Sequence, residues 1–136
     1  MCEPISEGGC LCGAVRYRID GSPVVSAICH CQTCRKTASA PALPFLTFPV
    51  ERFVLTLGRP SDFQSSAGVA RSFCGRCGAP LTYRSEREPG LIDVMTCSLD
   101  EPEAFPPTHH IWVSHKLAWE TITDGLAAFA RTSAEG

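Results

Sequence analysis

The sequence lacks several features that would place it at once in a large class of proteins. No apolar run approaches the ~20 residues that a membrane-spanning helix needs, so we expect no membrane partner. There is no basic excess, because the formal net charge is −2 and the pI is about 6.1, which argues against a nucleic-acid partner. Helical periodicity is also scarce along the chain.

The N-terminal segment, Met1–Glu7, has neither the basic stretch nor the apolar stretch of a secretory signal. We therefore expect a cytoplasmic protein, in a compartment where thiols stay reduced. In such a setting, clustered cysteines indicate metal ligands or catalytic groups rather than disulfides.

The chain does contain enough apolar material for one folded domain. Hydrophobic residues make up 44% of it and charged residues 19%, which excludes an intrinsically disordered chain. A length of 136 residues falls within the ~100–200 residues usual for one domain. We therefore expect a single domain over residues 1–136, with a frayed polar tail at 131–136.

Glycine and proline divide the chain into short segments. There are 11 of each, and the runs between them are rich in β-branched and aromatic residues, which favours strands. We therefore predict a mainly β fold with few short helices. The predicted strands are Ala14–Ile19, Val24–Cys29, Leu46–Phe48, Phe53–Leu57, Val69–Phe73, Leu81–Arg84, Leu91–Cys97 and His110–Val113. The predicted helical turns are Arg35–Ala40 and Asp100–Glu103.

Cysteine is the residue in clear excess, with nine in the chain. An odd count fits poorly with a closed set of disulfides. Cys2 lies near the terminus and has no assigned role, and Cys97 is expected to be a buried strand residue. The other seven cysteines form three motifs, which are Cys10-Leu11-Cys12, Cys29-His30-Cys31-Gln32-Thr33-Cys34 and Cys74-Gly75-Arg76-Cys77.

The spacing within each motif suits a metal ion. In an extended chain, residues i and i+2 point to one face, so a C-x-C pair can direct two sulfurs at one ion. A C-x-x-C pair needs a tight turn, and Gly75 and Gly78 are placed to supply positive φ angles. Seven thiols cannot fill two four-cysteine sites, so the economical division is four plus three.

In that division, the 10/12 and 74/77 pairs form a closed zinc site, and the cysteines at 29, 31 and 34 form a three-thiolate site with a vacant position. Three protein ligands and an open position are typical of catalytic zinc. Pairing 10/12 with 29/31 is also arithmetically possible. The four cysteines at 10, 12, 74 and 77 are alternatively buried structural thiols without a metal. The three-cysteine motif is alternatively a redox triplet, or a structural zinc site completed by His30, His109 or His110.

These motifs resemble the glutathione-dependent formaldehyde-activating enzyme family, whose domain also occurs in centromere protein V. The resemblance runs in order through Gly8–Tyr17, Cys29–Lys36, Arg71–Leu81, Ser98–Asp100 and His110–Trp119, and covers about residues 5–129. It implies a mainly β, Mss4-like fold in which sheets meet like a tent. It also implies a structural zinc on Cys10, Cys12, Cys74 and Cys77 and a second, catalytic zinc on Cys29, Cys31 and Cys34.

The activity that the resemblance implies is the addition of glutathione to formaldehyde, which gives S-hydroxymethylglutathione and is formally a carbon–sulfur lyase reaction. Three thiolates on Zn²⁺ leave a negative site, which favours capture of the substrate thiol over strong polarisation of a carbonyl. Because glutathione carries carboxylates, we expect cationic side chains nearby, and Arg35 and Lys36 are the first candidates. We expect Trp112 and Trp119 in the core or in a groove wall.

A second class of function fits the same residues. Two zinc ions would also stabilise a β scaffold that acts as a non-catalytic binding module for a protein partner or a metabolite. The vacant position and the Arg35-Lys36 pair favour the enzyme, whereas the lack of an evident general base near the three cysteines favours the module. The sequence leaves monomer and homodimer open.

Overall fold

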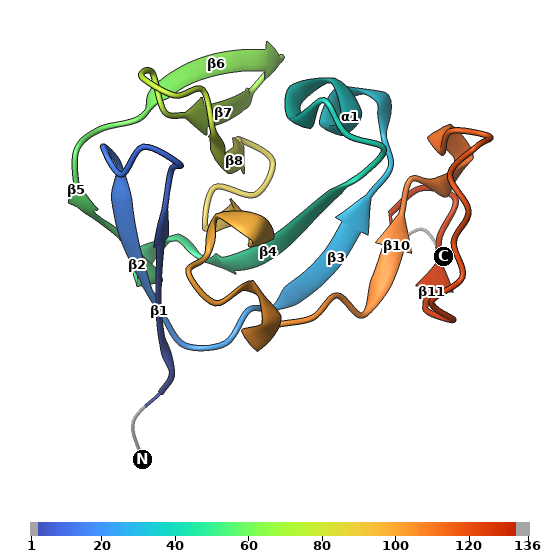
Figure 1. Cartoon of the computed structure of the whole chain (residues 1–136), viewed down its shortest axis with the longest axis horizontal. Helices are drawn as coiled ribbons and strands as arrows, with labels where there is room; N and C mark the ends of the chain where they lie inside the picture. The colour runs from blue at the N-terminus through green and yellow to red at the C-terminus, as the bar shows by residue number, and fades with distance from the viewer. Residues whose placement is uncertain (1–2, 133–136) are drawn as a thin grey trace.

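The computed structural model describes residues 3–132 of the chain as two β-sheets with one short α-helix (Figure 1). Cys2 and residues 133–136 of the tail lie outside the described residues. The prediction of a mainly β single domain with few short helices is confirmed. No helix in residues 3–132 has the length and apolar character needed to cross a bilayer.

The smaller sheet has three antiparallel strands in the order β1-β2-β5. These strands are β1 (Ile5–Gly9), β2 (Arg16–Asp20) and β5 (Phe53–Leu57). They stand together on one side of the molecule in Figure 1, away from the C-terminal strands.

The larger sheet has eight strands in the order β11-β10-β3-β4-β9-β8-β7-β6. In this sheet β10 runs parallel to both β3 and β11, and the other neighbours are antiparallel. Its strands are β3 (Val25–Cys29), β4 (Leu43–Pro49), β6 (Ser61–Ser66), β7 (Val69–Phe73), β8 (Pro80–Ser85), β9 (Leu91–Met95), β10 (His109–Ile111) and β11 (Ala127–Ala128).

The helical segments are short and connect strands. The α-helix α1 (Gln32–Ala38) lies beyond the end of β3 (Figure 1). The 3₁₀ turns are η1 (Val50–Arg52), η2 (Thr96–Ser98), η3 (Pro102–Ala104) and η4 (Val113–His115).

The eight predicted strands are all present, six of them with shifted ends, and three further strands were not predicted. Strands β1 and β6 have polar or glycine-rich sequences with little alternation, and β11 is only two residues long. The prediction for Cys97 was wrong, because β9 ends at Met95 and Cys97 lies exposed in η2. We predicted a frayed tail that begins at residue 131. The Arg131 backbone is instead attached to the fold, because its C=O accepts a hydrogen bond from the Trp112 N–H.

Successive side chains of a β-strand point to opposite faces of the sheet, so the central strands contribute residues to both faces. On β4, Leu46 and Phe48 are fully buried in the main core, which also takes Ile92 and Val94 from the neighbouring β9. The residues between them point to the opposite face, where they line a cavity. The same alternation therefore builds the core on one side of the large sheet and the lining of a cavity on the other.

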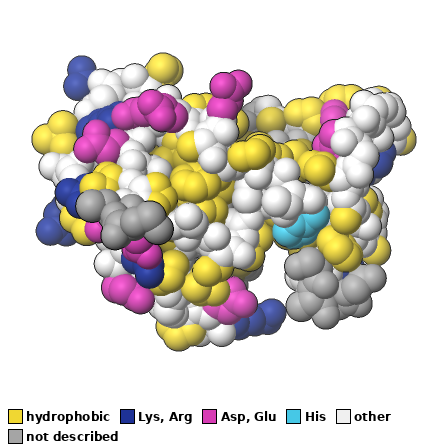
Figure 2. All heavy atoms as spheres, turned by 90° about the horizontal axis from the view of Figure 1, so that it is seen from below, with side chains coloured by type: hydrophobic (Ala, Val, Ile, Leu, Met, Phe, Trp, Pro, Cys, Tyr) yellow, Lys and Arg dark blue, Asp and Glu magenta, His cyan; other side chains and the backbone are white. Residues whose placement is uncertain are grey.

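The surface carries charges of both signs. Figure 2 shows Lys and Arg side chains scattered among acidic and hydrophobic ones over the face seen from below. One surface ion pair connects the two halves of the chain, because the Arg16 guanidinium donates to both carboxylate oxygens of Asp100 at 2.9 and 2.5 Å. Exposed pairs of this kind contribute little to stability.

Candidate metal centres and the adjoining cavity

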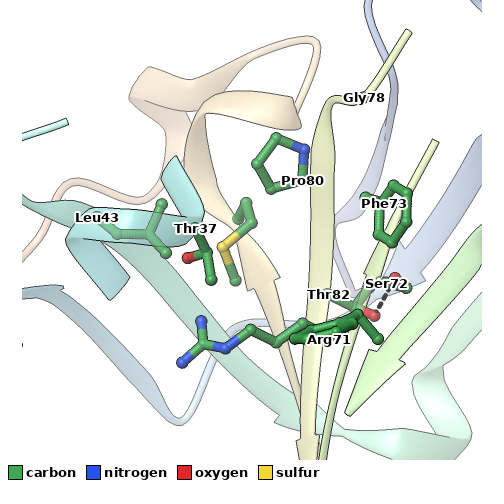
Figure 3. Close-up of a pocket in the computed structure, with 10 residues that line it drawn as sticks. Thr37, Leu43, Arg71, Ser72, Phe73, Gly78, Pro80 and Thr82 are labelled. Carbon is green, nitrogen blue, oxygen red and sulfur yellow. Dashed lines mark hydrogen bonds between the residues drawn. The ribbon is translucent and has the colours of Figure 1, made fainter. Parts of the chain in front are cut away.

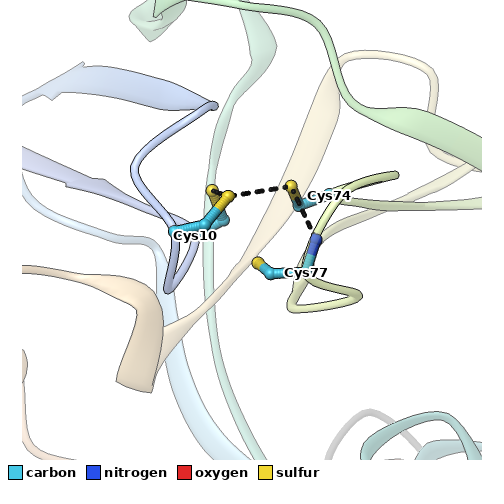
Figure 4. Close-up of side chains that lie close together, drawn as sticks. Cys10, Cys74 and Cys77 are labelled. Atoms are coloured by element: carbon cyan, nitrogen blue, oxygen red, sulfur yellow. Dashed lines mark hydrogen bonds between the residues drawn. The ribbon is translucent and has the colours of Figure 1, made fainter.

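Four cysteines from two distant parts of the chain meet between the two sheets (Figure 4). Cys10 and Cys12 lie in the turn after β1, and Cys74 and Cys77 lie in the turn between β7 and β8. Their sulfur atoms all lie within 4.8 Å of one another. We call this set the four-cysteine group.

Matching backbone geometry shapes the two turns. Gly13 and Gly78 follow the second cysteine of each pair, and both have a φ of +81°, a conformation that glycine adopts without strain. Backbone N–H groups donate to the sulfurs, including Val15 to Cys10 at 3.3 Å. The expectation for Gly75 was wrong, since it is not among the positive-φ residues; a Cβ there would instead lie 2.7 Å from the Ser61 Oγ.

The sulfur spacing of the four-cysteine group suits zinc. A tetrahedral ion with Zn–S bonds near 2.3 Å needs sulfurs about 3.8 Å apart. The Cys10–Cys12 and Cys12–Cys74 sulfur pairs are each separated by 3.7 Å. Hydrogen bonds from the backbone of Ala79, and then of Cys12, lower the pKa of the Cys77 thiol to about 6, which favours the thiolate that a metal ion requires.

A second set of three cysteines comes from one local segment. Cys29 ends β3, Cys31 caps the N-terminus of α1, and Cys34 lies in the first turn of that helix. The Cys34 N–H donates to the Cys31 sulfur at 3.3 Å, and the three sulfurs lie within 4.8 Å of one another. We call this set the three-cysteine group. It has no fourth Cys, His, Asp or Glu ligand among residues 3–132.

The three thiols share protons unequally. Hydrogen bonds from Cys29, and then from Cys34, lower the pKa of the Cys31 thiol, while donation to Cys31 raises the pKa of Cys29. Thiols that crowd together in this way bind a cation well, because a positive ion removes the penalty for ionising all three.

The three-cysteine group opens onto a cavity of about 400 Å³ that we call the sheet cavity. Its floor is one face of the large sheet, because strand pairing aligns Cys29 with Leu43, and Phe45 with Met95. Leu43, Phe45 and Met95 make that floor largely apolar beside the cysteines. Substrate-sized cavities in proteins are typically of this kind, apolar with a few polar groups.

Arg71 is the cationic residue that reaches the cysteines. It extends from β7, its Nη2 lies 3.7 Å from the Cys34 sulfur, and its Nε donates to the Ser65 Oγ at 3.1 Å. Its guanidinium also lies over the Tyr83 ring, 4.9 Å from the centroid. These contacts fix a positive charge where the sheet cavity meets the three-cysteine group.

A smaller pocket of about 210 Å³ adjoins the sheet cavity between α1 and the β7–β8 hairpin. The two share Leu43, Arg71 and Met95 as lining residues. Figure 3 shows the Arg71 side chain reaching across this pocket toward Thr37 and Leu43. Arg71 therefore separates two hollows on the same face of the sheet.

The structure places the predicted cationic residues elsewhere. Arg35 lies on α1 with its Nε donating to the His30 backbone C=O at 3.4 Å, and Lys36 is exposed on the same helix. Neither side chain lines the sheet cavity. Their predicted role in binding an anionic substrate stays a prediction, and Arg71 occupies the place beside the sulfurs that we expected them to fill.

The histidines form a separate buried chain. His30 is not part of the three-cysteine group; it is 1% exposed and its Nε2 shares a 2.9 Å hydrogen bond with the His110 Nδ1. The His110 Nε2 lies 2.8 Å from a carboxylate oxygen of Asp124. His109, its neighbour on β10, faces the other way and lines the sheet cavity.

The two tryptophans have different positions. Trp112 lines the sheet cavity, and its backbone has a φ of +57°, a left-handed conformation that turns the chain at the end of β10. Trp119 is 70% exposed, so the expectation of a core or groove position was wrong for that residue.

Sequence reasoning passed over Arg71 and Asp93, which both line the sheet cavity. Asp93 had a usable signal, since it is the one charged residue in the apolar strand Leu91–Met95, and buried charges are rare. Arg71 had no such signal, because the local sequence of a strand does not show which residues lie beside it across the sheet.

Together the fold and its two cysteine groups define a small β protein with two sites suited to metal ions. The model of one protein family, described as glutathione-dependent formaldehyde-activating enzyme, matches residues 5–115. The chain belongs to this family.

Individual relatives agree with that assignment. A Halomonas elongata protein named "Putative glutathione-dependent formaldehyde-activating enzyme" is 30% identical over 85% of this chain and 80% of its own length. A Schizosaccharomyces pombe protein named as an uncharacterized lyase is 30% identical over 75% of this chain and 85% of its own length. A crystal structure of a Rhodobacter sphaeroides protein shares the fold, with a TM-score of 0.60 and 17% identity over 90% of this chain and 98% of that one.

Proposed function

We propose that this chain is a zinc-dependent carbon–sulfur lyase-type enzyme that condenses glutathione, or a related thiol, with formaldehyde. The family description and the names of the two relatives support this reaction class. The observation that carries the proposal is the position of the three-cysteine group, which opens directly onto the sheet cavity beside Arg71. A buried structural site would have no need of such a cavity.

In this proposal each cysteine group holds one zinc ion. The four-cysteine group is a closed structural site, because four cysteine sulfurs are enough to fill the tetrahedral coordination of a zinc ion. The three-cysteine group leaves one position open, and a zinc ion held there would accept the substrate's sulfur and keep it as a thiolate. The proposed setting is the cytoplasm, where these cysteines and the substrate thiol stay reduced.

The chain's own residues bind and orient the thiol. Arg71 is held by Ser65 and Tyr83 and is placed to receive a carboxylate of the substrate. The apolar floor excludes water from the reacting sulfur. The sulfur–carbon bond forms as the C=O π pair moves to the carbonyl oxygen, and that oxygen takes up the proton that the thiol released.

The test measures S-hydroxymethylglutathione formation by NMR after adding glutathione and formaldehyde to zinc-loaded protein. We expect a rate above that of the spontaneous reaction, and we expect Cys34→Ser to abolish the excess. Cys97→Ser is the matched control, because Cys97 is exposed and outside both groups. If the rate equals that of the spontaneous reaction while glutathione binds tightly, the chain is a non-catalytic binding module and the enzyme proposal is wrong.

A further inference from the structure

The sheet cavity contains an acidic group that the proposed thiol capture does not use. Asp93 on β9 lies opposite Thr47 on β4, and the Thr47 Oγ1 donates to the Asp93 carboxylate at 2.6 Å. Within residues 3–132, the Asp93 carboxylate accepts no other side-chain hydrogen bond and forms no ion pair. Glu88, in the β8–β9 loop, adds a second carboxylate to the lining.

Among the described residues this carboxylate has no ion-pair partner. Burial raises the pKa of Asp93 to about 6, which shows that its charged form is poorly solvated there. The nearby Arg71 directs its guanidinium to Cys34, Ser65 and Tyr83 instead. A cation bound from solution would supply the missing partner.

The register sets how far Asp93 lies from Cys29 along the sheet. Cys29 pairs with Leu43, and Asp93 pairs with Thr47, which is four residues further along β4. At about 3.3 Å per residue, the two rows are about 13 Å apart along the strand, before side chains lean toward each other. The ammonium of glutathione lies roughly 10 Å from its sulfur when extended, whereas that of free cysteine lies only about 4 Å away.

We propose that Asp93, held by Thr47, binds the primary ammonium group of the thiol substrate. The sheet cavity then selects thiols that carry a free amino group about one γ-glutamyl unit from the sulfur. Arg71, whose Nη2 contacts the Cys34 sulfur, and the carboxylates of Asp93 and Glu88 match the opposite charges of a zwitterionic peptide thiol. This inference rests on the proposed function, since it assumes that the thiol binds at the three-cysteine group.

The first test compares two ligands on the unaltered protein. Calorimetric titration of zinc-loaded wild type at pH 7.5 should give N-acetylglutathione about 10- to 100-fold weaker affinity than glutathione, the effect expected for losing one hydrogen-bonded charge. Equal affinities would overturn the ammonium site and leave the proposed function standing. If neither thiol binds, both the ammonium site and the proposed function are wrong.

The second test assigns the effect to Asp93. In Asp93→Asn, glutathione should bind as weakly as N-acetylglutathione, while Asp62→Asn, an exposed carboxylate outside the cavity, should behave as wild type. S-methylglutathione, which cannot form a thiolate but keeps its ammonium, should also bind Asp93→Asn less tightly than wild type. An equal rate loss in Asp93→Asn for the acetylated and free thiols, with affinities unchanged, would make Asp93 a proton donor instead and overturn the inference.

Discussion

Arg71 lies with its Nη2 atom 3.7 Å from the sulfur of Cys34, a residue 37 positions earlier in the chain. The contact joins β7 to helix α1 across the mouth of the sheet cavity. It places one fixed positive charge against a group of three thiols, and a zinc ion held by three thiolates would leave that group negative overall. Arg71 therefore favours the thiolate forms of Cys31 and Cys34, and in the proposed function it would also contact an anionic substrate.

Removing this charge should weaken substrate binding. We expect Arg71→Gln to raise the dissociation constant for glutathione about tenfold or more, because a hydrogen bond to a charged group is lost. Calorimetric titration measures it, with zinc content and circular dichroism as checks on the fold. Arg59→Gln, an exposed site outside the cavity, is the control. A larger loss of glutathione affinity in Lys36→Gln than in Arg71→Gln would show that the anionic substrate binds beside α1 instead.

The two cysteine groups should respond differently to substitution. Cys74→Ser removes a ligand that ties the turn after β1 to the β7–β8 hairpin, so we expect loss of one zinc ion and unfolding at room temperature. Structural zinc contributes about 10–16 kcal/mol in small peptides, as much as a whole domain's stability. Cys34→Ser should also lose one zinc ion but keep a cooperative thermal transition. Elemental analysis and thermal denaturation monitor both, and collapse of Cys34→Ser would make the three-cysteine group structural.

The half-buried carboxyl of Asp93 should make stability depend on pH. Its pKa rises from 3.8 to about 6 on folding, so between these values the folded state binds more protons than the unfolded state. Stability therefore falls as the pH rises through this range and is constant above it. We expect the free energy of unfolding of Asp93→Asn to exceed that of wild type by up to about 3 kcal/mol at pH 7.5, with a smaller difference at pH 5.

Urea denaturation of both proteins at the two pH values measures this difference. The other titratable groups that line the cavity are Arg71 from β7, Tyr83 from β8, Glu88 from the β8–β9 loop, His109 from β10 and the three cysteines. Because these are common to both proteins, their titration cancels to a first approximation in the comparison. If the difference in unfolding free energy between the two proteins does not change with pH, the titration of Asp93 is not its cause.

The buried histidine chain should contribute to stability without binding substrate. His110→Ala leaves the His30 Nε2 buried without its partner, which costs about 1–3 kcal/mol. Urea denaturation should show that loss, whereas the affinity for glutathione should change little, because His110 does not line the sheet cavity. His115→Ala, at an exposed position, should lose less stability. A fall in glutathione affinity equal to that of Arg71→Gln would place His110 in the site.

Much of the fold was predictable from local pattern. Segments such as Phe53–Leu57 and Val69–Phe73 are strands with the predicted bounds, because β-branched and aromatic residues between turn formers favour extended chain. Strand β6 was not predictable in this way, since Ser61–Ser66 is polar and is ordered by pairing with β7. The C-x-C pair was also misplaced, because Cys12 lies in a turn after β1 and not in extended chain.

The sequence by itself determined the three cysteine motifs, because short spacings restrict where two sulfurs can point. It left open whether the 10/12 pair meets 74/77 or 29/31, and the structure brings it to Cys74 and Cys77. Only the tertiary structure decided which charged residues face the three-cysteine group. Arg71 and Asp93 reach the sheet cavity through strand order and register, and register is set by long-range pairing and turns rather than by neighbours in sequence. Arg35 and Lys36 are adjacent to Cys34 in sequence, but the helix that begins at Gln32 does not place them in the cavity lining.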